Sequence, residues 1–289
     1  MSTTQIACLG GGNMGRALLQ ALLRAGTPAT SLAVGEPHAA TRAALAQDLG
    51  IAAHATNAAA IHGAQLVILA VKPQEALATL TDLRDALTAG NPVLLSVAAG
   101  LRCAALAAAS GARRVVRAMP NRPALVGAGA AGLFADVDVD SAARDMASAV
   151  MRAAGSVVWL PDEAMMDAVT ALSGSGPAYF FLMAEALAAA GVAQGLTAEI
   201  AGKLAIATLQ GAGVMAAQSD GDLARLRAEV TSRGGTTAAA LEILDAPQGL
   251  RPLLARAVTA ATRRSQELGQ QTAFDPNNMS RQGKDPRNG

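Results

Sequence analysis

The stretch IACLGGGNMGRALLQALLRAG, residues 6–26, decides the fold class. It runs from a short apolar strand into a G-x-G-x-x-G loop and then into an amphipathic helix. Gly10 permits a tight turn, Gly12 lets the backbone approach a pyrophosphate, and Gly15 lets the helix pack closely on the strand. A structural glycine turn is the alternative. The order of strand, loop and helix favours a dinucleotide site, with the helix dipole facing the phosphates.

Beyond this stretch, short apolar runs alternate with helical patterns as far as residue 160. This alternation is typical of a mostly parallel, doubly wound α/β sheet, so we expect a Rossmann-type N-terminal domain. Further strands are expected at 32–34, 65–70, 93–97, 114–119 and 156–159, and helices at 39–49, 74–87, 101–109 and 141–153.

From Pro161 onward the strand signals stop, which predicts an all-helical C-terminal domain. The expected domains are residues 1–160, which carry the dinucleotide motif, and 161–274. A mobile polar tail is expected at 275–289. The helices of the second domain are expected at 162–172, 177–194, 197–217, 223–230, 236–244 and 249–268.

Residues 178–193 are apolar on nearly every side, which raises the question of a membrane span. Glu185 interrupts the run, and glycine-rich flanks keep it below the ~20 residues that a span requires. A helix of this kind is then expected in a domain core or at a subunit interface. The second explanation predicts an oligomer and no membrane partner.

Composition excludes several other classes of protein. Lysine and arginine number 23 against 22 aspartates and glutamates, and aromatic residues make up only 2% of the 289 residues, so a nucleic-acid partner is not expected. The two cysteines, Cys8 and Cys103, are expected to be small core residues of a cytoplasmic, reducing environment. The three histidines show no metal-ligand spacing, and the N-terminus lacks a signal-peptide pattern.

The segment VTSRGGTTAAALEIL, residues 230–244, lays small donors at the start of an alanine-rich helix. Ser232 and Thr237 bring hydroxyls, while Gly234 and Gly235 bring unshielded backbone N–H groups. Such a helix start binds anions and suits a small carboxylate. The alternative is an ordinary glycine turn capped by a threonine.

Two further loops follow expected strands at the edge where an open α/β sheet binds its ligand. ILAVKPQ, residues 68–74, carries Lys72, which either meets a phosphate or ribose of the cofactor or lies in solvent. LLSVAAG, residues 94–100, ends in small residues that let a flat ring come close.

These motifs together resemble the pyrroline-5-carboxylate reductase family over residues 5–268. The resemblance implies reduction of L-1-pyrroline-5-carboxylate to L-proline with NADPH or NADH, the final step of proline synthesis. It also implies a Rossmann domain and a helical domain that interlocks with a second copy in a homodimer, sometimes assembled into a decamer. The motifs that carry it are GGGNMG (10–15), AVKPQ (70–74), SVAAG (96–100), RAMPN (117–121) followed by Pro123, SGSGPAYF (173–180) and TSRGGTTAAALE (231–242).

Carried over residue by residue, the resemblance implies a cofactor site and a substrate site. It implies that Ser232, Gly234 and Gly235 bind the substrate carboxylate. It also implies that Thr237, the one expected catalytic residue, hydrogen-bonds the ring nitrogen. Reduction of a protonated imine needs position and electrostatics more than an acid or a base. The expected cofactor residues are Leu9, Gly10, Gly11, Gly12, Asn13, Met14, Glu36, Asn57, Ala70, Val71, Lys72, Pro73, Val97, Ala98 and Ala99.

Some positions leave details and alternatives open. Arg233 stands where many relatives carry proline, and Asp220 is either near the substrate or a plain loop carboxylate. Glu36 is expected to bond the 2′-hydroxyl of NADH and repel the 2′-phosphate of NADPH, which Arg42 offsets. The alternative functions are a β-hydroxyacid-dehydrogenase-like enzyme, whose catalytic lysine is missing before Lys203, and a non-catalytic NADP-sensing protein.

Overall fold

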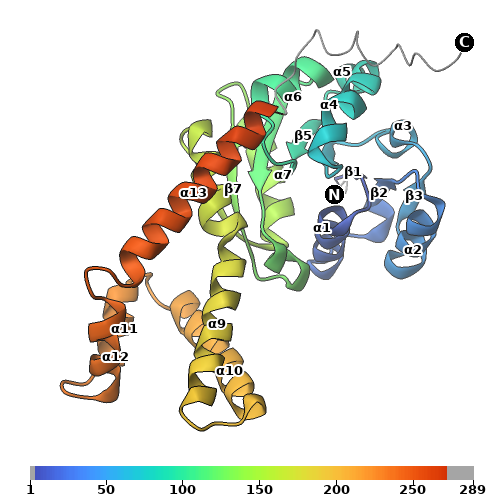
Figure 1. Cartoon of the computed structure of the whole chain (residues 1–289). Coiled ribbons are helices and arrows are strands. Elements are labelled where there is room, and N and C mark those ends of the chain that lie inside the picture. The colour runs from blue at the N-terminus through green and yellow to red at the C-terminus, as the bar shows by residue number, and fades with distance from the viewer. Residues whose placement is uncertain (1–3, 272–289) are drawn as a thin grey trace, which may run out of the picture. The chain divides into compact units, whose positions relative to one another are not determined.

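The computed structural model describes residues 4–271 and confirms the Rossmann-type sheet (Figure 1). Its eight strands lie in the order β3-β2-β1-β4-β5-β6-β7-β8, and every neighbouring pair is parallel except β6 with β7. The strands are β1 (Ile6–Leu9), β2 (Leu32–Gly35), β3 (Ala52–His54), β4 (Leu66–Leu69), β5 (Val93–Ser96), β6 (Arg114–Met119), β7 (Gly129–Ala135) and β8 (Gly155–Trp159).

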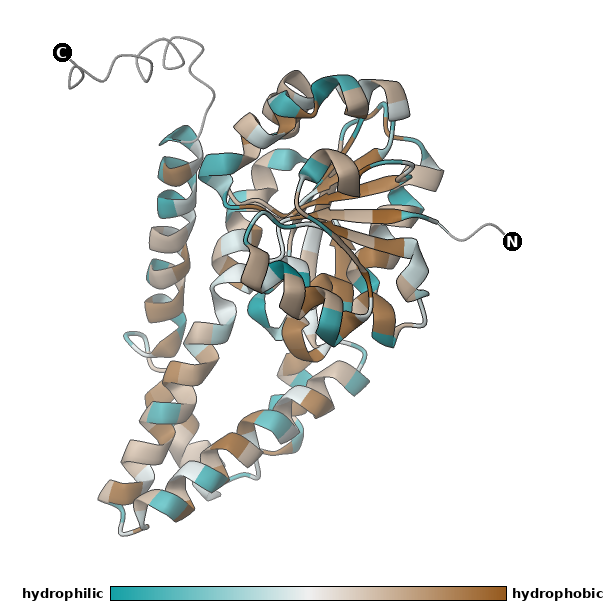
Figure 2. Ribbon diagram, turned by 90° about the vertical axis from the view of Figure 1, so that its right-hand side faces the viewer, coloured by the Kyte–Doolittle hydropathy of each residue, from teal (hydrophilic) through white to brown (hydrophobic). Residues whose placement is uncertain are grey.

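Both faces of the sheet are buried, so the central strands are apolar throughout rather than alternating (Figure 2). In β1, Ile6 and Cys8 join the core that includes residues of α1 and α7, whereas Ala7 and Leu9 join the core of α4 and α6. The helices of this part are α1 (Asn13–Arg24), α2 (Ala39–Leu49), α3 (Asn57–Ala60), α4 (Pro73–Asp82), α5 (Arg84–Gly90), α6 (Cys103–Ser110) and α7 (Ser141–Arg152).

Two strands were not expected from the sequence. β3 has only three residues, one exposed and two half-buried, so its local pattern carries little hydrophobic signal. β7 reads GAAGLFA, in which small residues obscure the strand pattern. The expected helix 74–87 is also divided, because Leu83 ends α4 and α5 starts afresh at Arg84.

The chain after Pro161 is helical, as expected, and its first helix is longer than expected. A 3-10 turn (Glu163–Met165), α8 (Met166–Val169) and a π-helical turn (Thr170–Gly174) lead into α9 (Gly176–Ala193). The remaining helices are α10 (Ala198–Gln218), α11 (Leu223–Glu229), α12 (Thr236–Leu244) and α13 (Leu250–Gln271).

The chain divides into two compact units, and the division comes later than residue 160. Among the described residues, one unit holds 4–174 together with 262–271, and the other is Ser175–Ala261. Residues 163–174 join the first unit because they pack on the sheet: a Cβ atom on Gly132 of β7 would lie 2.8 Å from Val169. Ser265 Oγ also donates a hydrogen bond to Asp167, at 2.6 Å. The expected tail, 275–289, lies outside the described residues.

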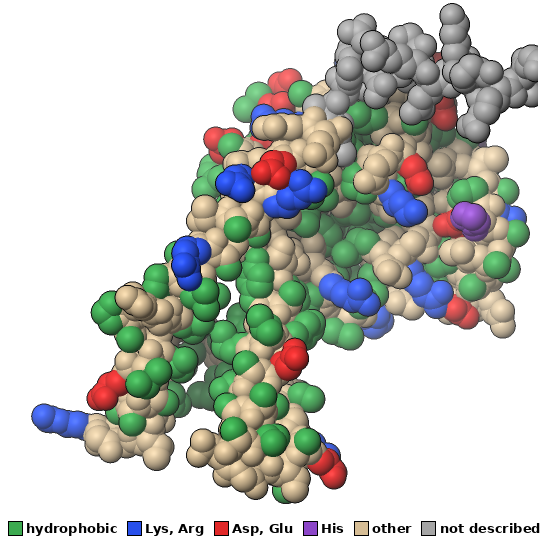
Figure 3. All heavy atoms as spheres, viewed as in Figure 1, with side chains coloured by type: hydrophobic (Ala, Val, Ile, Leu, Met, Phe, Trp, Pro, Cys, Tyr) green, Lys and Arg blue, Asp and Glu red, His purple; other side chains and the backbone are tan. Residues whose placement is uncertain are grey.

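Two helical stretches are long and apolar enough to cross a membrane by length and composition, residues 163–193 and 198–218. The expectation that glycines shorten the first of them was therefore wrong, because Gly174 and Gly176 are accommodated within a continuous helix. Many apolar side chains of α9 and α10 lie at the surface, and part of them are visible in Figure 3. Those more than half exposed include Phe180, Phe181, Leu182, Leu187, Leu204 and Ile206.

Candidate active site

The glycine loop joins β1 to α1 and is hydrogen-bonded to β2. The backbone N–H of Gly10 donates to Gly35 O at 3.0 Å, and Gly10 has a φ of +96°, which favours glycine. A Cβ atom on Gly15 would lie only 2.1 Å from Gly10 O, so this position admits no side chain. Gly15 therefore brings the helix against the loop, as its place in the pattern predicts.

The start of α1 is open to an anion. Gly12 is its N-cap, no side chain caps the helix, and a Cβ atom on Gly12 would have no neighbour within 4 Å. Within the described residues, the backbone N–H groups of Asn13 and Met14 have no hydrogen-bond acceptor. Unsatisfied N–H groups at the positive end of a helix dipole suit a phosphate.

Glu36 directly follows β2 and is fixed beside the glycine loop. Its Oε2 accepts a hydrogen bond from Gly11 N at 3.0 Å, and its Oε1 accepts one from His38 N at 2.9 Å. The residue is only 7% exposed. Arg42 Nη1 donates to the carbonyl oxygens of Glu36 and Pro37, at 2.9 and 3.0 Å, so both charged groups lie at the same turn.

Asn57, the first residue of α3, lies over the end of β2. A Cβ atom on Gly35 would be 2.3 Å from Asn57 Oδ1, which explains why residue 35 is a glycine. The Oδ1 atom is buried and has no hydrogen-bond partner in the described part of the chain. A buried acceptor without a donor is costly, and a bound ligand with a donor group satisfies it.

The other expected cofactor residues follow β4 and β5 at the same edge of the sheet. Ala70 N donates to Leu9 O at 2.9 Å, and Val97 N donates to Leu69 O at 3.1 Å, so these loops are tied to the strands beside them. Lys72 is the N-cap of α4, and its exposed side chain forms no ion pair or hydrogen bond in residues 4–271. The structure thus brings the expected cofactor residues together along the carboxyl edge of β1, β2, β4 and β5.

The expected substrate residues lie together in the second unit, between α11 and α12. Gly234 has a φ of +70°, and Gly235 N donates to Ser232 O at 3.1 Å, which folds the loop back on itself. Gly235 is the N-cap of α12, and no side chain caps that helix. The alternative in which Thr237 is only a cap was therefore wrong, because Thr237 lies inside the first turn.

The first turn of α12 also presents open donors. Within residues 4–271, the backbone N–H groups of Thr236, Thr237 and Ala238 have no hydrogen-bond acceptor. Asp220, in contrast, is engaged locally: its Oδ1 lies 3.0 Å from Arg225 Nη2, and this bond lowers the pKa of the Asp220 carboxyl. Arg233 is exposed.

The motif RAMPN contains two buried contacts that the sequence analysis did not foresee. Arg117 Nη1 lies 3.1 Å from Glu163 Oε1, which also accepts Cys103 N at 2.8 Å. Asn121 donates from Nδ2 to Ser173 O at 3.0 Å and accepts Ala130 N at 2.9 Å. The motif was recognisable, but its partners are 9 to 52 residues away in the sequence, so local patterns give no sign of them.

The two cysteines are buried and free, as expected. Burial raises the pKa of both thiols to about 12, and the nearby carboxylates of Glu36 and Glu163 add to the effect. Both groups are therefore neutral thiols at physiological pH and do not act as nucleophiles.

Comparisons with known proteins agree with this arrangement. Residues 163–268 match the family model "Pyrroline-5-carboxylate reductase dimerisation", and residues 5–100 match "NADP oxidoreductase coenzyme F420-dependent". The chain is 44% identical to the pyrroline-5-carboxylate reductase of Pseudomonas aeruginosa over 94% of its own length and 99% of the relative's. It is 41% identical to that of Haemophilus influenzae, over 91% of this chain and 97% of the relative.

Solved structures give the same result. A pyrroline-5-carboxylate reductase from Coxiella burnetii superposes with a TM-score of 0.89 at 37% identity, over 92% of this chain and 99% of the other. The Plasmodium falciparum pyrroline carboxylate reductase, solved with NADP bound, has a TM-score of 0.78 at 28% identity, over 93% and 99% of the two chains. With relatives this similar over nearly its whole length, the chain belongs to the pyrroline-5-carboxylate reductase family.

Proposed function

We propose that this protein reduces L-1-pyrroline-5-carboxylate to L-proline with NADPH or NADH, as the last step of proline biosynthesis. Its relatives carry the name of that activity, and it belongs among the oxidoreductases acting on CH–NH groups. The observation that carries the proposal is the joint presence of an open glycine loop and an open helix start with Ser232 and Thr237.

The residues of the sheet edge fit a nicotinamide dinucleotide. The open N–H groups of Asn13 and Met14 suit the pyrophosphate, and the unpaired acceptor of Asn57 suits a donor of the adenosine half. Lys72 is free to meet a phosphate or ribose oxygen. The bound cofactor supplies the hydride that reduces the imine.

The chain's own contribution to the reaction is orientation. The N–H groups at the start of α12 and the Ser232 hydroxyl hold the carboxylate of the substrate, and the Thr237 hydroxyl meets the ring nitrogen. A pyrrolinium ring already carries its proton, so the site needs no separate acid. The buried, neutral thiols agree with a reaction that does not use a cysteine nucleophile.

The assay that tests the proposal follows NAD(P)H oxidation at 340 nm with pyrroline-5-carboxylate, together with chromatographic detection of L-proline. We expect turnover with at least one of the two cofactors. A folded protein that forms no proline above background with either would contradict the proposal. The same assay separates it from a β-hydroxyacid dehydrogenase, which oxidises a hydroxyacid instead, and from an NADP sensor, which binds without turnover.

Cofactor preference provides a second prediction. Glu36→Ser removes a carboxylate from the turn where the adenosine ribose is expected. We therefore expect the binding free energy of NADPH to become more favourable than that of NADH by about 1–3 kcal/mol, and by less where solvent screens the charge. Glu36→Gln removes the charge and keeps one acceptor for Gly11 N, which isolates the electrostatic part. Dissociation constants from cofactor fluorescence and the ratio of kcat/KM report the change. An unchanged ratio of kcat/KM for NADPH and NADH in both variants would show that Glu36 only holds the glycine loop and does not contact the cofactor.

The exposed apolar surface of α9 and α10 supports a homodimer through the helical domain, with assembly into a decamer as a further step. Contiguous apolar patches of this kind are rare on soluble monomers, and we propose that a second copy covers them rather than a membrane, in a cytoplasmic protein without a nucleic-acid partner. Light scattering at micromolar concentration should give at least twice the 28.9 kDa of the chain. A monomer mass would refute the proposed interface.

A further inference from the structure

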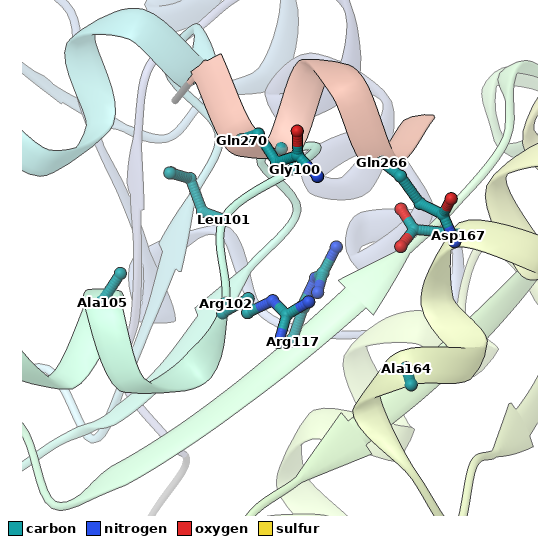
Figure 4. Close-up of a pocket in the computed structure, with 10 residues that line it drawn as sticks. Gly100, Leu101, Arg102, Ala105, Arg117, Ala164, Asp167, Gln266 and Gln270 are labelled. Carbon is teal, nitrogen blue, oxygen red and sulfur yellow. The ribbon is translucent and has the colours of Figure 1, made fainter. Parts of the chain in front are cut away.

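A cavity of about 600 Å³ lies in the N-terminal unit, apart from the residues assigned to cofactor and substrate (Figure 4). The loop after β5, the strand β6, the helix α8 and the last turns of α13 enclose it. Its volume falls within the range of ~300–1,000 Å³ that is usual for small-molecule sites. The polar side chains that line it are Arg102, Arg117, Asp167, Gln266 and Gln270.

One side of the cavity is positively charged and partly rigid. Arg117 is 6% exposed, and the ion pair with Glu163 fixes its guanidinium through one nitrogen, Nη1. Arg102 is exposed, and its side chain has no ion pair or hydrogen bond with any of residues 4–271. Figure 4 shows both arginine side chains directed into the cavity. One fixed and one free guanidinium group on the same side of the cavity suit a carboxylate.

The other side carries a carboxylate. Asp167 is held through Oδ1, which accepts Ser265 Oγ at 2.6 Å, and Figure 4 shows the carboxylate directed toward the side of the cavity where Arg117 lies. Among the described residues, no ion pair joins Asp167 to either arginine. Gln266 and Gln270 of α13 add amide donors and acceptors.

These charges select the chemical class of the ligand. Two guanidinium groups and the carboxylate of Asp167 line the cavity, and Glu163, which does not line it, balances the charge of Arg117. A simple anion would meet the carboxylate of Asp167 and a simple cation would meet the guanidinium groups, whereas a zwitterion satisfies both sides at once. We propose that the cavity is a second ligand site, separate from the catalytic one, for a small zwitterionic amino acid, namely L-proline. The identity of the ligand rests on the proposed function, because L-proline is the product of that reaction.

The cavity is also close in sequence to the cofactor loop. Gly100, which lines it, directly follows Val97–Ala99 and has a φ of +79°. Helix α13 packs on this glycine: a Cβ atom on Gly269 would lie 3.2 Å from Gly100 O. A ligand in the cavity therefore contacts the same loop that is proposed to bind the cofactor. L-proline bound there would contact this loop without occupying the catalytic site.

Calorimetric titration of L-proline into the full-length protein without cofactor tests the proposal. The protein carries Thr237→Val, so that binding at the catalytic site is weakened. We expect saturable binding that Arg102→Gln and Asp167→Asn each weaken by about ten- to a hundredfold. Asn at position 167 keeps an acceptor for Ser265, and melting temperatures confirm that both variants are folded. Arg113→Gln, an exposed arginine outside this cavity, is the matched control and should bind as the parent does.

Two analogues of L-proline test whether binding needs both charges of the zwitterion. N-acetyl-L-proline lacks the cationic nitrogen and L-prolinamide lacks the carboxylate, so both should bind about tenfold or more weakly than L-proline. Absence of L-proline binding, binding that neither cavity variant weakens, or equal binding of the analogues would overturn the proposal. Turnover of pyrroline-5-carboxylate by the unsubstituted protein, measured in parallel, keeps this outcome distinct from a failure of the proposed function.

Discussion

Thr237→Val should lower kcat/KM for pyrroline-5-carboxylate by a factor of roughly ten to a hundred or more, while NADPH binding stays nearly intact. Valine keeps the β-branched shape and removes only the hydroxyl that is proposed to meet the ring nitrogen. Because Gly235 is the N-cap and no side chain caps α12, the change takes no capping bond from the helix. Steady-state kinetics and cofactor fluorescence on the same preparation measure both quantities.

Thr236→Val is the matched control for this experiment. It makes the same exchange one residue earlier in the same turn, at an exposed position to which no role is assigned. We expect its kcat/KM to remain close to that of the unsubstituted protein. Equal losses in both variants, or no loss at Thr237, would remove the Thr237 hydroxyl from the proposed site.

Gly15→Ala should have the second large effect, on the fold and the cofactor site together. The new Cβ atom would lie 2.1 Å from Gly10 O, 3.1 Å from Cys8 Sγ and 3.3 Å from Ala70 Cβ. The first of these is a backbone atom of the glycine loop, so the contact is relieved only if the loop or α1 moves. We expect the free energy of unfolding to fall by about 1–3 kcal/mol or more, with a lower melting temperature and weaker NADPH binding.

Gly12→Ala tests the effect of this position on cofactor binding separately from its effect on stability. Gly12 has a φ of −66°, which alanine adopts freely, and its Cβ atom would have no protein neighbour within 4 Å. We expect an unchanged melting temperature and NADPH binding weakened by about tenfold or more, since the methyl group stands where the pyrophosphate approaches the backbone. If Gly12→Ala binds NADPH as tightly as the unsubstituted protein, the pyrophosphate does not lie against Gly12.

The elements that the sequence predicted well are those whose signals are local. The strand 114–119 and the helices 39–49 and 236–244 have the expected bounds, and the two helices are delimited by adjacent glycines: Gly50 ends the first and Gly235 precedes the second. The order strand, glycine loop, helix likewise predicted the Rossmann sheet, since each glycine role is a backbone requirement at one position. The open start of α12 belongs to the same group, as its donors all lie within seven residues, Ser232 to Ala238.

Tertiary structure decided the features that join distant parts of the chain. The short strand β3 and the small-residue strand β7 become strands by pairing with β2, β6 and β8, and neither has enough local signal. Gly174 stays within a helix although glycine disfavours one, and a Cβ atom there would lie 2.9 Å from Met119 Cε, so close packing outweighs propensity.

The Arg117–Glu163 pair and the Asp167–Ser265 bond span 46 and 98 residues, and they orient two of the charged residues that line the cavity. Sequence by itself predicted the fold class, the glycine loop and the open start of α12, because each depends on neighbouring residues. Only the folded chain decided which charges face one another across a cavity, because such contacts form when sheet and helices pack and leave no periodic trace in the sequence.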